Sequence, residues 1–110
     1  MGDARRHKLV WSVPREALEV TREAVFAAGA GQIGDYERCS WYTAGTGTFL
    51  AGEGADPSIG RVGTKERVSE VRVETVVTAD RAQGVVEALR AAHPYEEVAL
   101  ELYPLVELEP

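Results

Sequence analysis

Apolar and polar residues alternate in some stretches of the chain and follow helical spacing in others. Apolar and polar side chains alternate over residues 8–13, as in a strand. Pro14 ends this strand and is suited to the first position of a helix. Over residues 15–28 apolar side chains recur on one helical face, with charged side chains opposite. Gly29 and Gly31 then end the helix, because glycine adopts the left-handed backbone of C-terminal caps. The first third of the chain is therefore predicted to be a strand followed by an amphipathic helix.

The middle of the chain has the composition of strands. Residues 36–50 are rich in aromatic and β-branched side chains, with interruptions at Gly45 and Gly47 that predict a bulge or the close approach of another backbone. A turn-rich connection follows, and residues 66–78 again alternate apolar with polar. We expect these two strands to form an antiparallel hairpin.

The last third repeats the order of the first. Residues 80–92 carry an apolar helical stripe that Pro94 ends, and residues 98–103 alternate as a final strand. The β-α-β-β-α-β order predicts an α+β fold, the ferredoxin-like sandwich, with both helices on one face of a four-stranded antiparallel sheet. The other face has no cover, so we expect a homo-oligomer. The predicted domain spans residues 8–106, between a disordered segment 1–7 and a tail 107–110.

Charge and composition narrow the possible partners. The chain has 110 residues, 12 basic against 18 acidic, for a net charge of −6. Nucleic-acid binding depends on Lys and Arg that neutralise phosphates, so no nucleic-acid partner is expected.

No apolar run is long enough for a signal peptide or a membrane span. Cys39 is the single cysteine, so no internal disulfide can form and a cytoplasmic location is expected. We interpret it as a buried core thiol rather than a nucleophile.

One glycine motif resembles a nucleotide cradle. Residues 29–34 match the G-x-G-x-x-G fingerprint letter for letter, but the fingerprint binds pyrophosphate only between a strand and a following helix N-terminus. Here a helix precedes the glycines and a strand follows. The motif is better explained as a helix cap and turn.

The densest chemical cluster is His93-Pro94-Tyr95-Glu96-Glu97, at the junction between the second helix and the last strand. The helix dipole and the nearby carboxylates would favour the cationic form of His93. A capping role and a ligand or acid–base role for His93 both stay open. Glu96 and Glu97 are adjacent, so they would point to opposite faces unless the strand begins after them.

Several motifs in order resemble the central insert domain of the YqfO-like (Nif-like dinuclear metal) proteins. The motifs are Gly29-Ala30-Gly31-Gln32-Ile33-Gly34-Asp35-Tyr36-Glu37-Arg38-Cys39-Ser40, Gly45-Thr46-Gly47-Thr48-Phe49, Pro57-Ser58-Ile59-Gly60, Glu70-Val71-Arg72-Val73-Glu74 and His93-Pro94-Tyr95-Glu96-Glu97. The resemblance implies a PII-like and CutA-like fold, and CutA proteins form homotrimers. It also implies that the two metal ions of full-length members lie in a flanking domain that this chain lacks, so a cyclohydrolase activity is not carried over. Gln32 and Arg38 stand where the family often has histidine.

These observations predict an oligomeric binding module, most simply a homotrimer, that takes a small ligand or a divalent cation at a subunit boundary. The alternative is a ligand-free assembly or protein-interaction domain, and an enzyme with Glu96 or Glu97 as general base is a third hypothesis. The candidate ligand or metal residues are His93, Tyr95, Glu96 and Glu97. The candidate backbone contacts are Gly45, Thr46, Gly47 and Thr48, because glycines let a ligand approach the main chain. No cofactor beyond a possible divalent cation is expected.

Overall fold

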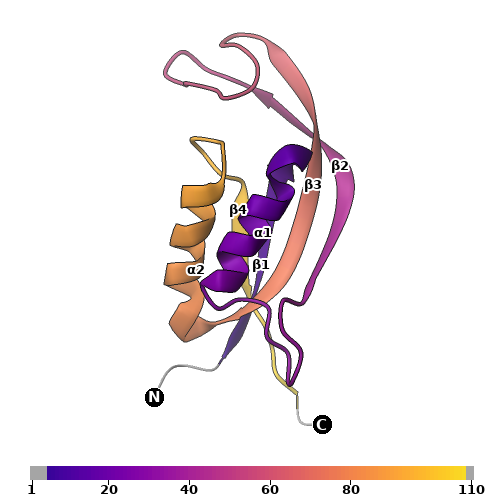
Figure 1. Ribbon diagram of the computed structural model, residues 1–110. Coiled ribbons are helices and arrows are strands. Elements are labelled where there is room, and N and C mark those ends of the chain that lie inside the picture. The colour runs from indigo at the N-terminus through magenta and orange to yellow at the C-terminus, as the bar shows by residue number, and fades with distance from the viewer. Residues whose placement is uncertain (1–4, 109–110) are drawn as a thin grey trace.

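The computed structural model describes residues 5–108 and has the predicted order of elements (Figure 1). The four strands are β1 (Arg6–Pro14), β2 (Ser40–Leu50), β3 (Lys65–Thr78) and β4 (Leu100–Pro104). The helices are a short 3-10 turn, η1 (Arg15–Ala17), which runs into α1 (Leu18–Ala27), and α2 (Ala79–Ala92). No helix in the described part of the chain is long and apolar enough to cross a membrane.

The strands form one antiparallel sheet in the order β2-β3-β1-β4, and both helices cover the same face (Figure 1). The predicted ferredoxin-like fold and the predicted hairpin of the middle strands are confirmed. The core lies between the helices and the two central strands. Its buried residues are Leu9, Trp11, Val13, Ala17, Leu18, Val25, Phe26, Ala30, Val71, Val73, Val77, Val85, Val86 and Leu89.

The sheet begins before the predicted domain boundary. β1 starts at Arg6, two residues ahead of Lys8, and its first residues pair with the end of β3 and with β4. Arg6 also forms an ion pair with Glu107, at 2.8 Å between Nε and Oε1, which ties the predicted tail to the sheet. Residues 1–4 of the predicted N-terminal segment lie outside the described residues, as do residues 109–110 of the predicted tail.

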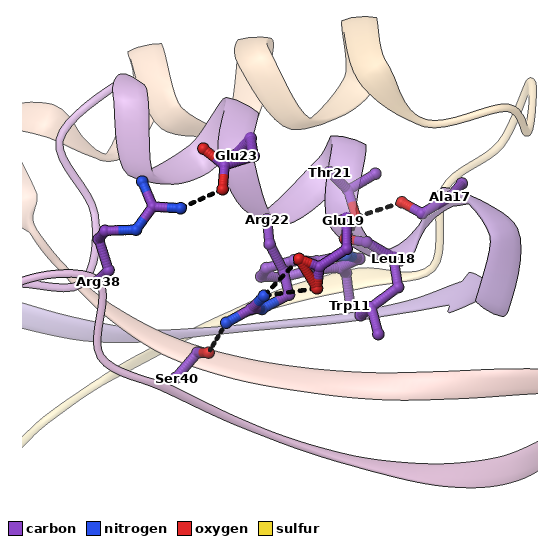
Figure 2. Close-up of polar contacts among 9 residues, drawn as sticks. All are labelled: Trp11, Ala17, Leu18, Glu19, Thr21, Arg22, Glu23, Arg38 and Ser40. Carbon is purple, nitrogen blue, oxygen red and sulfur yellow. Dashed lines mark hydrogen bonds and ion pairs between the residues drawn. The ribbon is translucent and has the colours of Figure 1, made fainter.

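A buried polar contact fixes α1 against β1 (Figure 2). Thr21 is fully buried, and its hydroxyl accepts a hydrogen bond from the indole Nε1–H of Trp11 at 3.2 Å. The same hydroxyl donates to the carbonyl of Ala17 at 2.9 Å, one turn back. Both polar groups are thereby satisfied in the core, where an unpaired one would cost stability.

The end of α1 follows the prediction. Gly29 has φ +112°, the Ala30 N–H donates to the Val25 carbonyl and the Gly29 N–H donates to the Phe26 carbonyl, which is a Schellman cap. Gly31, at φ +90°, then bonds the Val76 carbonyl of β3. The glycine motif is therefore a helix cap and a turn, as interpreted from the sequence.

Cys39 is not a core thiol, so this prediction is wrong. Its side chain is half-buried and lies outside the core cluster. The main chain makes the packing contacts instead: the Cys39 N–H donates to the Gly31 carbonyl at 2.8 Å, and its carbonyl accepts from the buried Thr75 hydroxyl at 2.6 Å.

The β2–β3 hairpin extends beyond the helices and gives the molecule an elongated shape, 50 × 25 × 24 Å (Figure 1). We call its projecting end, residues 45–70, the arm. The pairing of Ser40 with Thr75 continues without a break to Leu50 with Lys65, so no bulge forms at Gly45 or Gly47. The close approach at Gly47 is made by a side chain and not by another backbone, because an added Cβ would collide with the carboxylate of Glu70.

The sheet face opposite the helices carries mixed polar and aromatic side chains, which we call the open face. Val10 lies on it, because its sequence neighbours Leu9 and Trp11 point into the core. Trp41 lies on the same face because it pairs with Glu74, as Val10 does, and Tyr103 does so because it pairs with Lys8, next to Leu9. The side chains of Trp41 and Tyr103 are exposed. The described chain thus presents aromatic surface on a face that no helix covers.

Candidate functional site

A groove of about 490 Å³ lies between the arm and the segment that joins α2 to β4. We call that segment, residues 93–99, the joint. It lies at the same end of the molecule as the arm (Figure 1). The groove is lined mainly by apolar atoms, and its size is typical of small-molecule sites. Its lining residues are Ser12, Gly47, Thr48, Phe49, Leu50, Ala51, Gly52, Ala55, Pro57, Ser58, Ile59, Glu70, Tyr95, Glu96, Glu97 and Ala99.

His93 fixes the start of the joint. Its side chain is buried, and its Nδ1 accepts a hydrogen bond from the Tyr95 N–H at 3.1 Å. Nε2 must then carry the proton, and it donates to the Ser12 carbonyl of β1 at 2.7 Å. Both ring nitrogens are therefore occupied by the main chain, which favours the capping role over the ligand role.

The charge expected for His93 is wrong. Desolvation by burial lowers its pKa below the ordinary value, and this outweighs the bond to Ser12 and the negative charge of Glu70, which both raise the pKa. Because Nδ1 is already an acceptor, adding a proton there would break the bond to Tyr95. The neutral imidazole is the form that the structure uses.

Tyr95 crosses from the joint to the arm. Its hydroxyl donates to Oε2 of Glu70 at 2.8 Å, and its ring lies 4.9 Å from the His93 ring, centroid to centroid. Burial, this hydrogen bond and the charge of Glu70 raise the pKa of Tyr95 well above its ordinary value. The phenol is thus a hydrogen-bond donor that holds a carboxylate at the groove wall.

Glu96 makes a second connection between the joint and the arm. Its Oε1 accepts a hydrogen bond from the main-chain N–H of Asp56 at 2.7 Å, across 40 residues of sequence. Glu97 also lines the groove and is exposed. β4 begins only at Leu100, after both glutamates, so the condition under which both could serve one site is met.

The structure brings together five of the eight candidate residues. Tyr95, Glu96 and Glu97 line the groove with Gly47 and Thr48, whereas Gly45 and Thr46 lie further back on β2 and do not line it. His93 lies behind the groove and positions Tyr95.

Sequence reasoning missed the apolar wall and one of the acids. Phe49, Pro57 and Ile59 line the groove, and so does Glu70. Before the fold is known, the segments 57–60 and 70–74 and the side chain of Phe49 count only as parts of the family resemblance. The collision that a side chain at position 47 would have with Glu70 is the physical link between the motifs 45–49 and 70–74, and it appears only once β2 and β3 are paired.

The donor set does not form a closed metal site within one chain. Among residues 5–108, no group of three or more His, Cys, Asp or Glu side chains is close enough to hold an ion. Two of the groove acids already accept internal hydrogen bonds, Glu70 from Tyr95 and Glu96 from Asp56. A divalent cation implied by the fold family therefore does not fit the residues of a single subunit.

A smaller hollow of about 220 Å³ lies at the other end of the sheet. Arg6, Gln32, Asp80 and Arg81 line it with Gly29 and residues 76–78. Arg6 is held by Glu107, and the hollow has less than half the volume of the groove. The groove is the better candidate.

The sequence is similar to one segment of longer bacterial proteins. No protein-family model matches the chain. It is 58% identical over 105 residues to a protein of Mycobacterium tuberculosis named GTP cyclohydrolase 1 type 2 homolog, covering 96% of this chain and 28% of that protein. The protein of the same name in Bacillus subtilis is 46% identical over 98 residues, 89% of this chain and 26% of that protein. The chain thus spans about a quarter of the length of these relatives.

Solved structures agree. The Bacillus cereus protein related to NIF3 superposes with a TM-score of 0.83 at 42% identity, covering 97% of this chain and 27% of that one. The periplasmic divalent cation tolerance protein CutA of Archaeoglobus fulgidus superposes with a TM-score of 0.68 at 13% identity, covering 94% and 87%, which shows the fold alone. The resemblance drawn from the motifs is confirmed: the chain has a CutA-like, ferredoxin-like fold and is similar to one domain of the longer NIF3-related, YqfO-like proteins.

Proposed function

We propose that this domain is a small-ligand-binding module whose ligand occupies the groove between the arm and the joint. The observation that carries the proposal is that two segments 40 residues apart are bonded to each other around an apolar hollow of ligand size, through Asp56 and Glu96. The bond from Tyr95 to Glu70 closes the same corner. Such a hollow, largely formed before binding, is typical of small-molecule sites.

The proposal is binding rather than catalysis. Glu70 and Glu96 each use one carboxylate oxygen in an internal hydrogen bond that holds the groove wall, which gives both a structural role. A general base must instead have its oxygen within reach of the substrate proton. Glu97 is the acid of the groove for which no hydrogen bond is seen among the described residues, and one carboxylate without a positioned partner is weak support for an enzyme.

The second part of the proposal is that copies of the chain associate through the open face, as a homotrimer. Exposed Trp41 and Tyr103 support self-association, because aromatic side chains are enriched in protein interfaces. The proposal of a trimer rests on the resemblance to CutA.

The competing function is an assembly or interaction domain without a ligand, and the same open face favours it. A cytoplasmic location stays a prediction.

A neutral, environment-sensitive dye such as Nile red tests the groove. Ser58 lines the groove on the arm loop, so Ser58→Trp should fill it, whereas Ser69→Trp places the same ring on the arm outside it. We expect saturable dye binding in the wild type and in Ser69→Trp, and loss of binding in Ser58→Trp. Absence of saturable binding in the wild type, or unchanged binding in Ser58→Trp, would overturn the proposal.

Thermal unfolding tests the cation version separately. A cation that binds only the folded state must raise the melting temperature. Heating with zinc, copper or manganese at concentrations well above a plausible dissociation constant should then show a shift only if an assembled site exists. No shift for any of the three leaves the groove as a site for organic ligands.

A further inference from the structure

The charge on the groove wall is of one sign. Its lining includes three glutamates, Glu70, Glu96 and Glu97, and no Lys, Arg or His. None of the three takes part in an ion pair within residues 5–108. From this charge, and given the proposed function, we infer that the ligand is a small organic monocation, an ammonium or guanidinium group attached to an apolar or aromatic body.

The apolar part of such a ligand has a surface to bury against. The remaining lining is dominated by aliphatic and aromatic side chains, with Phe49 and Tyr95 the two aromatic ones. Burying apolar surface gives roughly 25 cal/mol per Å² removed from water. Aromatic rings near a cation add a further attraction. An inorganic cation would use none of this surface.

The charged part has acceptors that the fold leaves free. Glu70 uses Oε2 to accept from Tyr95, which leaves Oε1 beside Gly47, where the glycine leaves room for it. Glu96 uses Oε1 to accept from Asp56, which leaves Oε2. Glu97 has no hydrogen bond to another described residue. An ammonium group has three donors and a guanidinium five, so either can bond several carboxylate oxygens at once.

The negative charge around Tyr95 is consistent with a cationic ligand. Burial raises the pKa of Tyr95 most, and the hydrogen bond to Glu70 and the charges of Glu70 and Glu16 raise it further. These carboxylates therefore disfavour a further negative charge beside Tyr95. An anionic ligand such as a phosphate or carboxylate would be repelled, because the groove lining offers no basic side chain to pair with it.

Three probes of similar shape test the charge preference. They are 2-naphthylmethylamine as the cation, 2-naphthylmethanol as the neutral analogue and 2-naphthoate as the anion, with binding measured by calorimetry at low and at moderate salt. We expect the amine to bind roughly tenfold more tightly than the alcohol, as for a hydrogen bond to a charged group. The naphthoate should bind more weakly than both.

Matched variants separate a local from a general charge effect. Glu97→Gln and Glu70→Gln should each reduce the preference for the amine, and glutamine at position 70 can still accept from Tyr95. Glu87→Gln on α2 changes the net charge equally but lies outside the groove, so it should leave the preference unchanged.

The possible outcomes distinguish the two proposals. Equal binding of all three probes, lost in Ser58→Trp, would overturn the cation inference and leave the binding function in place. The same holds if Nile red binds and the amine does not, or if Glu87→Gln reduces the preference as much as Glu97→Gln does. Failure of Nile red and of every naphthyl probe to bind would overturn the binding function itself.

Discussion

His93 is the residue on which the joint depends, because it bonds both β1 and the main chain of Tyr95 while it is buried. Its pKa is lowered in the folded protein, so the unfolded chain binds a proton more readily. The stabilisation from the neutral ring is complete above the unfolded value of about 6.5 and is lost as the pH falls below it.

Urea unfolding between pH 7.5 and 5 measures this effect. The unfolding free energy of the wild type should fall as the pH drops below about 6.5, by about 1.4 kcal/mol for each unit between the folded and unfolded pKa. His93→Gln should be less stable at pH 7.5 and should lose less between pH 7.5 and 5. An equal loss in both proteins would show that His93 is not the titrating group.

Thr21 gives a second test at the scale of one side chain. Thr21→Val keeps the shape but removes the acceptor of the Trp11 indole N–H, which has no exposure through which water can replace it. We expect a loss of about 1–3 kcal/mol in the unfolding free energy, the cost of an unsatisfied buried donor. Thr21→Ser keeps the hydroxyl and serves as the control; if it costs as much as Thr21→Val, the hydrogen bond is not the cause.

Residue types were predicted better than residue environments. The cap at Gly29 could be predicted because only the local chain decides it, through a positive φ. The charge of His93 could not, since desolvation comes from β1 and the joint folding over it. Cys39 was assigned to the core by its chemistry, whereas its main chain, bonded to Gly31 and Thr75, is the part that packs.

At the scale of elements, the turn between α1 and β2 depends on Gly31. A Cβ there would lie 3.0 Å from the main-chain atoms of Arg38 and Cys39, and the backbone has positive φ. Gly63 has a similar φ, +81°, but open space around it. Comparing substitutions at Gly31 and Gly63 therefore separates the cost of the left-handed backbone from the cost of the collision with neighbouring atoms.

Both alanine variants should lose about 1–2 kcal/mol of unfolding free energy from the left-handed backbone alone. Gly31→Ala should lose clearly more than Gly63→Ala, because two main-chain segments would have to move apart. Denaturant unfolding of the two variants in parallel makes the comparison. Equal losses would mean that the turn adapts and that the collision is relieved without cost.

The elements themselves were predicted closely, except where distant segments meet. β4 starts at Leu100 and not at residue 98, because the joint turns across the end of β1, held by the Ser12 N–H to the Ala99 carbonyl and by His93. The groove has the same origin: it needs the arm and the joint together. Periodicity describes a local pattern and contains no information on such contacts.

At the scale of the whole molecule, the open face decides whether the chain is a single subunit. Trp41→Lys places a charge at an exposed position of this face and should reduce self-association at micromolar concentration. Val20→Lys, at an exposed position on α1, should not. Sedimentation equilibrium with circular dichroism checks both variants. A wild type that stays monomeric would contradict the assembly, and loss of fold in Trp41→Lys would mean that the residue supports the sheet.

Because β1 and β4 are antiparallel neighbours, with His7 opposite Pro104, the polypeptide enters and leaves the sheet side by side. A unit with adjacent entry and exit can be carried in the middle of a longer polypeptide as a side branch, without separating the parts before and after it. The arm and the joint lie at the far end from this attachment (Figure 1). A host protein of the kind found among the relatives would therefore hold the branch by its base, with the groove at the end away from the attachment.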